Sequence, residues 1–128
     1  MHIYSKTIAA MMIAGSAVPL AASSVVDPTI GAAVGGMIVV RDEVVRARTT
    51  DVWEFRFYGD EAAAVVVRGD GTTDLDLYVY DENGNLIASD TDASDYCIAS
   101  WTPKWTGRFT IKIVNLGYVW NEYDMIAD

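Results

Sequence analysis

Polar and apolar residues alternate along most of the chain after residue 36, with the period of two that is typical of half-buried β-strands. The clearest run covers residues 107–115, in which Phe109, Ile111 and Ile113 face the same side. Further strands are predicted at residues 37–45, 51–58, 62–68, 74–81, 85–89, 96–102 and 118–126. About eight short strands, with no helical pattern after the first 22 residues, predict an all-β fold: an antiparallel, jelly-roll-like β-sandwich.

The strand predicted at residues 74–81 separates an apolar face from a polar, aromatic one. Its core face carries Leu75, Leu77 and Val79, and its solvent face carries Asp74, Asp76, Tyr78 and Tyr80. The pair Asn83-Gly84 then predicts a tight turn into the next strand. We expect the two sheets to enclose a core made of Trp53, Phe55, Phe57, Leu75, Leu77, Trp101, Phe109, Ile111 and Ile113.

The first 22 residues have the pattern of a secretory signal peptide. A short start that includes Lys6 precedes an uncharged apolar run at residues 7–20, and small residues follow at 21–24. The alternative is a retained membrane anchor, but the run is shorter than the roughly 20 apolar residues that a spanning helix needs. The sequence therefore predicts a signal peptide at 1–22, an N-terminal lead at 23–44 and a sandwich at 45–128. It predicts a secreted or periplasmic protein.

Several motifs follow one another in a characteristic order. An aromatic, alternating strand at residues 52–58 precedes a Gly-Asp-Gly loop and the run D-L-D-L-Y-V-Y-D at 74–81. An acidic loop at 90–95 and the run G-R-F-T-I-K-I-V-N at 107–115 come next. This order resembles the bacterial pre-peptidase C-terminal domain, a secreted β-sandwich related to the collagen-binding domains of collagenases. The resemblance covers residues 45–128 and implies an accessory role beside an enzyme.

The chain is acidic, with 18 Asp and Glu against 9 Lys and Arg and a net charge of −9. Such a chain is repelled by nucleic acid and by anionic lipid, so we expect neither nucleic acid nor, after signal cleavage, a membrane as partner. The acidity is compatible with simple solubility outside the cell and with cation binding.

Cysteine and histidine are nearly absent. Cys97 is the single cysteine, which excludes an intrachain disulfide; it is expected to be a small buried hydrophobe, with a reactive thiol or an intermolecular link as alternatives. His2 is the single histidine and lies in the predicted signal peptide. A mature chain without histidine has no Ser-His or Cys-His pair and no His-based zinc site, so we predict that it is not an enzyme. A carboxylate-based hydrolase is the remaining catalytic alternative.

Acidic residues gather where the hairpin at residues 74–90 returns on itself. Asp74 and Asp76 share one strand face, Asp70 lies in the preceding loop, and Asp90 and Asp92 lie in the following one. Calcium takes six to eight oxygen ligands, chiefly carboxylates and carbonyls. These five residues are therefore candidate Ca²⁺ ligands, and some relatives implied by the resemblance bind calcium at a comparable edge. The alternative is turn chemistry, in which Asp side chains accept hydrogen bonds from their own backbone.

Aromatic residues fall on the expected outer surface. Tyr58, Tyr78 and Tyr80 face outward in their strands, and Trp105 lies in a turn. Aromatic side chains bind sugars and peptides because a flat apolar ring with a polar tip loses little entropy on docking. The alternative is that the tyrosines are good strand residues and that Trp105 packs its turn on the core.

We therefore predict an exported, non-catalytic binding or accessory module, stabilised by calcium, that engages an extracellular polysaccharide or protein. The alternative is a structural or chaperone-like partner of a separately encoded secreted protease.

Overall fold

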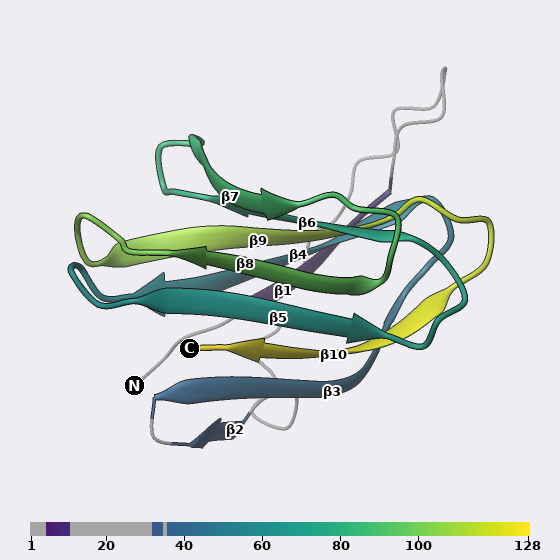
Figure 1. Cartoon of the computed structure of the whole chain (residues 1–128), viewed down its shortest axis with the longest axis horizontal. Coiled ribbons are helices and arrows are strands. Elements are labelled where there is room, and N and C mark those ends of the chain that lie inside the picture. The colour runs from purple at the N-terminus through teal and green to yellow at the C-terminus, as the bar shows by residue number, and fades with distance from the viewer. Residues whose placement is uncertain (1–4, 11–31, 35) are drawn as a thin grey trace.

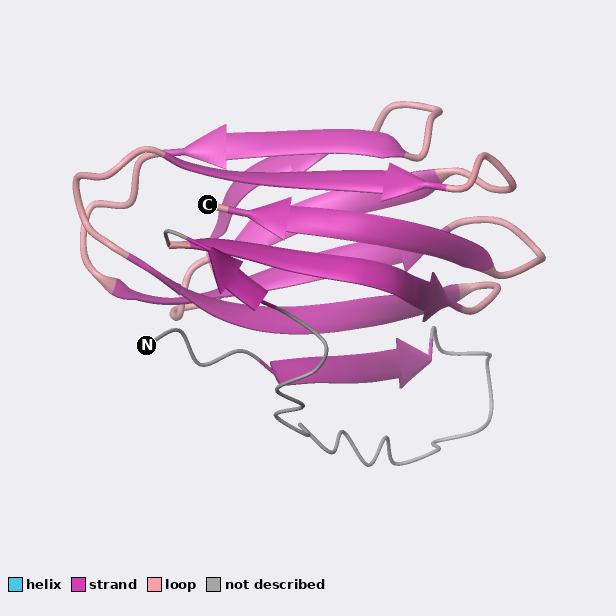
Figure 2. Cartoon of the chain, turned by 90° about the horizontal axis from the view of Figure 1, so that it is seen from below, coloured by secondary structure: helices cyan, strands magenta, loops and turns pink. Residues whose placement is uncertain are grey.

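The chain folds into two antiparallel sheets packed face to face. The structure is a computed structural model that describes residues 5–10, 32–34 and 36–128. Every regular element in this part of the chain is a strand, and the loops gather at the two ends of the sandwich (Figure 2). The predicted all-β sandwich is confirmed.

Within the described residues each sheet has five strands; Figure 1 shows how they are arranged. Sheet A has the order β1-β4-β9-β6-β7, and sheet B has the order β2-β3-β10-β5-β8. The strands are β1 (Ser5–Ala10), β2 (Ala32–Val34), β3 (Met37–Val45), β4 (Thr49–Phe57), β5 (Ala63–Gly69), β6 (Leu75–Tyr80), β7 (Leu86–Asp90), β8 (Tyr96–Trp101), β9 (Gly107–Asn115) and β10 (Asn121–Ala127).

The eight strands predicted from alternation correspond to β3 through β10, with ends that differ by a few residues. The largest difference is in β10, which begins at Asn121 instead of residue 118 because residues 116–120 form a loop. β3 lies within the segment predicted as a lead, yet it is a full strand of sheet B beside β10. The turn predicted at Asn83-Gly84 is present, and Gly84 has a φ of 81°, which a residue with a Cβ adopts only with strain.

β1 lies within the predicted signal peptide and pairs along the outer edge of β4. The rest of that segment, residues 1–4 and 11–22, and residues 23–31 and 35 of the predicted lead lie outside the described residues. No helix in the described ranges has the length and apolarity to cross a membrane.

The core is built by the inner faces of both sheets. β9 is the centre of sheet A, and its Phe109 and Ile111 lie directly opposite Phe55 and Trp53 of β4. All predicted core residues are buried except Trp101, which is half-buried and packs its ring edge-on against Phe57 at 4.8 Å between centroids. Sheet B adds a second set of buried residues: Ile38, Val40, Val45, Ala63, Val65, Val67, Cys97, Ala99, Tyr123, Met125 and Ala127.

A buried hydrogen-bond chain joins the two sheets. Trp53 of β4 donates its indole N–H to the hydroxyl of Tyr123 on β10 at 3.0 Å. That hydroxyl donates in turn to the carboxylate of Asp51, also on β4, at 2.7 Å. Burial, followed by the charge of Asp51, raises the pKa of Tyr123 well above its usual value, so the hydroxyl keeps its proton. The chain holds β4 and β10 at one relative position.

We expect Tyr123→Phe to lower the free energy of unfolding by about 3 kcal/mol, because the buried carboxylate of Asp51 and the indole of Trp53 each lose a hydrogen-bond partner. Urea unfolding followed by tryptophan fluorescence measures the change. Tyr118→Phe is the matched control: Tyr118 is 85% exposed, so its substitution should change stability by less than about 0.5 kcal/mol. Equal urea midpoints of unfolding for the two variants would contradict a structural role for this hydrogen-bond chain.

Candidate binding face

Two tyrosines and a lysine form the centre of the outer face of sheet A. Tyr78 and Tyr80 stand on the same side of β6, and their rings stack with centroids 6.4 Å apart and planes 25° apart. Lys112 of the neighbouring β9 places its ammonium 4.9 Å from the centroid of the Tyr80 ring, within the range of a cation–π contact. The two tyrosines predicted as a binding surface therefore lie together.

A shallow basin of about 470 Å³ lies beside Tyr80. Strands β4, β9 and β6 are neighbours in sheet A, so their outward side chains line it in register. The lining residues are Glu54, Tyr80, Asp81, Glu82, Gly84, Arg108, Thr110 and Lys112. Arg108 and Glu54 form an exposed ion pair at 3.9 Å. The basin therefore offers hydrogen-bond donors and acceptors around one aromatic wall.

A second hollow, of about 310 Å³, lies next to the basin and has a different character. Trp101, Pro103, Trp105, Phe109 and Ile87 give it apolar walls, while Asp81, Asn85, Thr102 and Lys104 add polar groups. Asp81 lines both the hollow and the basin. The indole N–H of Trp105 donates to Glu82 at 2.8 Å, which joins the hollow to the rim of the basin.

The turn between β6 and β7 forms the boundary between the two depressions and is held by Asp81. One carboxylate oxygen of Asp81 accepts the backbone N–H groups of Asn83 and Asn85, both at 2.9 Å, and the other accepts the Asn85 side-chain amide at 3.0 Å. The hydrogen bonds from Asn85 and Asn83 lower the pKa of Asp81. Asp81 therefore positions the turn, and its oxygens are engaged within it.

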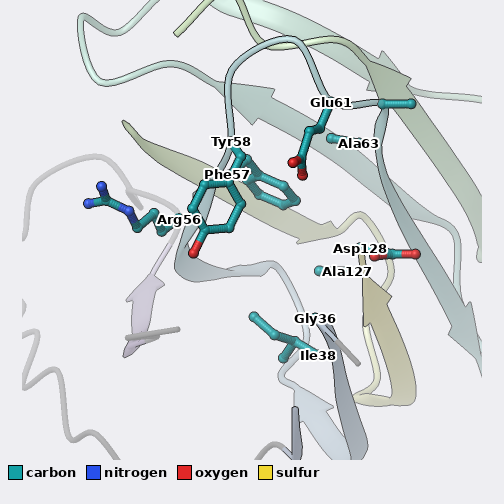
Figure 3. A pocket seen from close by; sticks show the side chains of 10 residues that line it. Gly36, Ile38, Arg56, Phe57, Tyr58, Glu61, Ala63, Ala127 and Asp128 are labelled. Carbon is teal, nitrogen blue, oxygen red and sulfur yellow. The ribbon is translucent and has the colours of Figure 1, made fainter. Parts of the chain in front are cut away.

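Tyr58 does not join the other two tyrosines. It lies just beyond the end of β4, which β9 separates from β6. It lines a separate hollow of about 150 Å³ together with Arg56 and Glu61, at the end of the sandwich where β3, β10 and β5 also contribute residues (Figure 3). The predicted surface of four aromatic residues is therefore divided: Tyr78, Tyr80 and Trp105 flank one continuous region, and Tyr58 lies elsewhere.

At the opposite end of β6, Asp76 departs from the expectation of an exposed carboxylate. It is 7% exposed, and one of its oxygens accepts the Tyr78 hydroxyl at 3.2 Å. Its other oxygen, like one oxygen of Asp74, is buried without a hydrogen-bond partner. Burial raises the pKa of Asp76 and the charges of Asp74, Asp90 and Asp92 raise it further, against the Tyr78 hydrogen bond, which lowers it. The hairpin thus brings these four carboxylates within electrostatic range of one another.

The same four charges act on Cys97, which lies beneath them in β8. Its thiol is buried and donates to the carbonyl of Leu75 at 3.1 Å. Burial and the neighbouring carboxylates raise its pKa to about 12. A thiol with this pKa holds almost no thiolate at neutral pH, so Cys97 behaves as the small buried hydrophobe predicted from the sequence.

Asp70, the fifth candidate ligand, is engaged in a separate network. One of its oxygens accepts the backbone and hydroxyl groups of Thr72, and the other accepts the backbone N–H of Glu122 at 3.1 Å. Burial acts to raise the pKa of Asp70, but these hydrogen bonds outweigh it and lower the pKa. In residues 5–10, 32–34 and 36–128, no three acidic, cysteine or histidine side chains are arranged to hold a metal ion.

Sequence reasoning missed the residues that complete the binding face. Glu54, Arg108, Thr110 and Lys112 alternate with buried residues in β4 and β9, but alternation does not show that β9 lies between β4 and β6. Trp101, predicted as a core residue, packs against the core but is only half-buried, and it also lines the apolar hollow. The missing signal is sheet order, which depends on contacts between distant segments.

Comparison with known proteins gives little further information. No protein-family model matches the chain, and no curated protein matches it. One solved structure is similar to this chain, with 16% sequence identity and a TM-score of 0.38. The alignment covers 71% of this chain and 20% of the chain in that structure. The structure comprises the CBM22-1 and GH10 modules of the Clostridium thermocellum endo-1,4-beta-D-xylanase 10B in complex with xylohexaose. This chain therefore spans about a fifth of that structure, and a similarity of this size supports no inference about ligand or reaction.

We expect Asp76→Asn to raise the Tm at pH 7 in the presence of a chelator. Because the pKa of Asp76 is raised in the folded state, its protonated form favours folding, and this contribution is complete below the ordinary value of 3.8 and lost as the pH rises through the folded-state pKa. The gain in Tm should therefore disappear near pH 3. Glu61→Gln, an exposed substitution at the hollow of Figure 3, is the control. A lower Tm for Asp76→Asn at pH 7 would refute this account.

Proposed function

We propose that this protein is a non-catalytic module that binds an extended extracellular polysaccharide through the basin beside Tyr80 and the adjoining Trp105 hollow. One observation carries the proposal: the two depressions share Asp81 and are joined by the Trp105–Glu82 hydrogen bond. A polymer chain can therefore contact both without leaving the surface of the protein.

The chemistry of the basin favours a polysaccharide over a protein ligand. Sugar hydroxyl groups both donate and accept, and the basin offers cationic donors in Arg108 and Lys112 next to anionic acceptors in Glu54 and Glu82. Hydrogen bonds to charged groups are stronger than those between neutral groups. The Tyr80 ring and the Trp105 hollow supply apolar surface for the C–H faces of sugar rings. An extended peptide would instead need a free strand edge or a row of apolar pockets.

Retention on a panel of insoluble polymers tests the proposal, with cellulose, xylan and chitin as polysaccharides and collagen fibrils as the protein alternative. We expect retention on at least one polysaccharide. Tyr80→Ala and Trp105→Ala should each weaken it about tenfold, which corresponds to about 1.4 kcal/mol. Tyr118→Ala is the control, because this exposed tyrosine lies in the loop at residues 116–120.

Retention on collagen alone would show that the ligand is a protein fibre and not a polysaccharide. No retention on any polymer would refute the proposal and would favour the alternative role beside a secreted protease. Sugar release during incubation, lost in an Asp74→Ala/Asp76→Ala double variant, would show a carboxylate-based hydrolase instead.

Calcium at the acidic edge is a separate proposal. Four carboxylates lie within electrostatic range of one another, and one buried oxygen of Asp76 and one of Asp74 lack a partner. A divalent cation that drew these oxygens together would stabilise them. Asp74, Asp76, Asp90 and Asp92 are the residues that would supply oxygen ligands. Asp70 would hold its loop in place through Thr72 and Glu122.

We expect Ca²⁺ to raise the Tm of the wild-type protein and EGTA to reverse the rise. A ligand present at 100 times its Kd stabilises a fold by about 2.7 kcal/mol. The Asp76→Asn variant should melt at the same temperature with and without Ca²⁺. A wild-type melting curve that neither Ca²⁺ nor EGTA moves would end the calcium proposal and leave the polysaccharide proposal intact.

A further inference from the structure

The outer face of sheet B has a composition unlike that of sheet A. Val39, Ile126, Val66 and Ile98 occupy one row directly across β3, β10, β5 and β8, as the pairing register shows. All four point away from the core, since their neighbours Val40, Met125, Val65 and Cys97 are buried. Figure 1 shows the four strands side by side. We call these four residues the apolar row; Ile98 is 48% exposed.

A second row on the same face carries charge. Asp124 of β10 lies opposite Arg68 of β5, and Arg68 lies opposite Tyr96 of β8. Arg41 of β3 forms an ion pair with Asp124 at 3.7 Å. Across the sheet this charged row therefore reads cation, anion, cation, aromatic. A groove of about 270 Å³ runs between the charged row and Val39, Val66 and Ile126 of the apolar row.

The order of the charged row makes it complementary to itself. A two-fold axis that runs parallel to the strands, between β10 and β5, sets β10 of one copy over β5 of the second copy. Asp124 then meets Arg68 of the second copy, and Arg41 meets the ring of Tyr96 of the second copy. Both contacts occur twice, and the first joins opposite charges while the second is a cation–π contact.

The same axis matches the apolar row with itself. Ile126 meets Val66 of the second copy, and Val39 meets Ile98 of the second copy. Aligned sheets pack with their strands about 30° apart, so the central pairs stay opposite one another. We infer that the outer face of sheet B binds a second copy of this chain in a face-to-face, two-fold dimer.

The charged row favours this occupant although the net charge of the protein opposes self-association. A chain of net charge −9 repels another copy of itself over most of its surface. Within the charged row two arginines flank one aspartate, so no like charges of this row face each other when two copies meet. Four strands at about 4.8 Å spacing make a contact smaller than the roughly 800 Å² per partner of a standard interface. The dimer is therefore a weak one that forms as concentration rises.

Sedimentation velocity of the full chain over a concentration series tests the inference. We expect the wild-type protein to shift from monomer to dimer with rising concentration. Ile98→Lys should raise the dimer Kd at least tenfold, because it places a lysine against the apolar row of each copy. Val119→Lys is the matched control, since Val119 is similarly exposed, at 54%, but lies in the loop at residues 116–120.

A charge series tests the geometry of the contact. Arg68→Asp should abolish the dimer, because it sets two aspartates against each other twice. Adding Asp124→Asn should restore part of it by removing that repulsion, and asparagine keeps the carbonyl oxygen that accepts the Asp42 backbone N–H at 3.0 Å. Thermal melting confirms that each variant is folded, and Ile98→Lys provides the test if Arg68→Asp does not fold.

A monomer at every concentration up to the solubility limit would overturn the inference, including the case in which this face binds a different protein. A dimer that neither Ile98→Lys nor Arg68→Asp weakens would overturn it as well, because the copies would then meet elsewhere. Polymer retention is a separate measurement on sheet A, so failure of one proposal leaves the other in place.

Discussion

The hydrogen-bond chain from Trp53 through Tyr123 to Asp51 is the contact that fixes one sheet relative to the other. The hydrophobic effect that buries the two inner faces is not directional, whereas hydrogen bonds are. A buried indole and a buried carboxylate that share one hydroxyl favour one relative position of the sheets, because a displacement would break both of these hydrogen bonds. The position of β4 over β10 follows from this constraint.

The inner faces of the two sheets pack against each other and are buried. The side chains that can contact a ligand or partner therefore lie on the two outer faces and at the loop ends. The outer face of sheet A carries alternating charges around Tyr78 and Tyr80, a composition suited to hydroxyl-rich ligands. The outer face of sheet B carries an apolar row beside a charged row, a composition suited to protein contact. The two faces lie on opposite sides of the core, so a protein bound to one leaves the other accessible.

The acidic edge shows how a motif can predict a fold better than a site. Leu75 and Leu77 lie in the core as the alternation required. Asp76 has the outward register that was predicted, yet it is buried because Tyr78 and the returning hairpin cover it. Asp70, adjacent to this edge in sequence, accepts hydrogen bonds from Thr72 and Glu122 instead. Spacing along the chain could not distinguish the buried carboxylate of Asp76 from the loop-stabilising carboxylate of Asp70.

The sequence by itself determined the strands from β3 to β10, the Asn83-Gly84 turn, the core faces and the burial of Cys97. These depend on local periodicity and on backbone preferences that act within a few residues. Only the tertiary structure decided that β9 lies between β4 and β6, that Tyr58 is separated from Tyr78 and Tyr80, and that four apolar residues align across sheet B. Strand order is set by packing between segments far apart in the chain, and a period of two is the same whichever strand lies beside it.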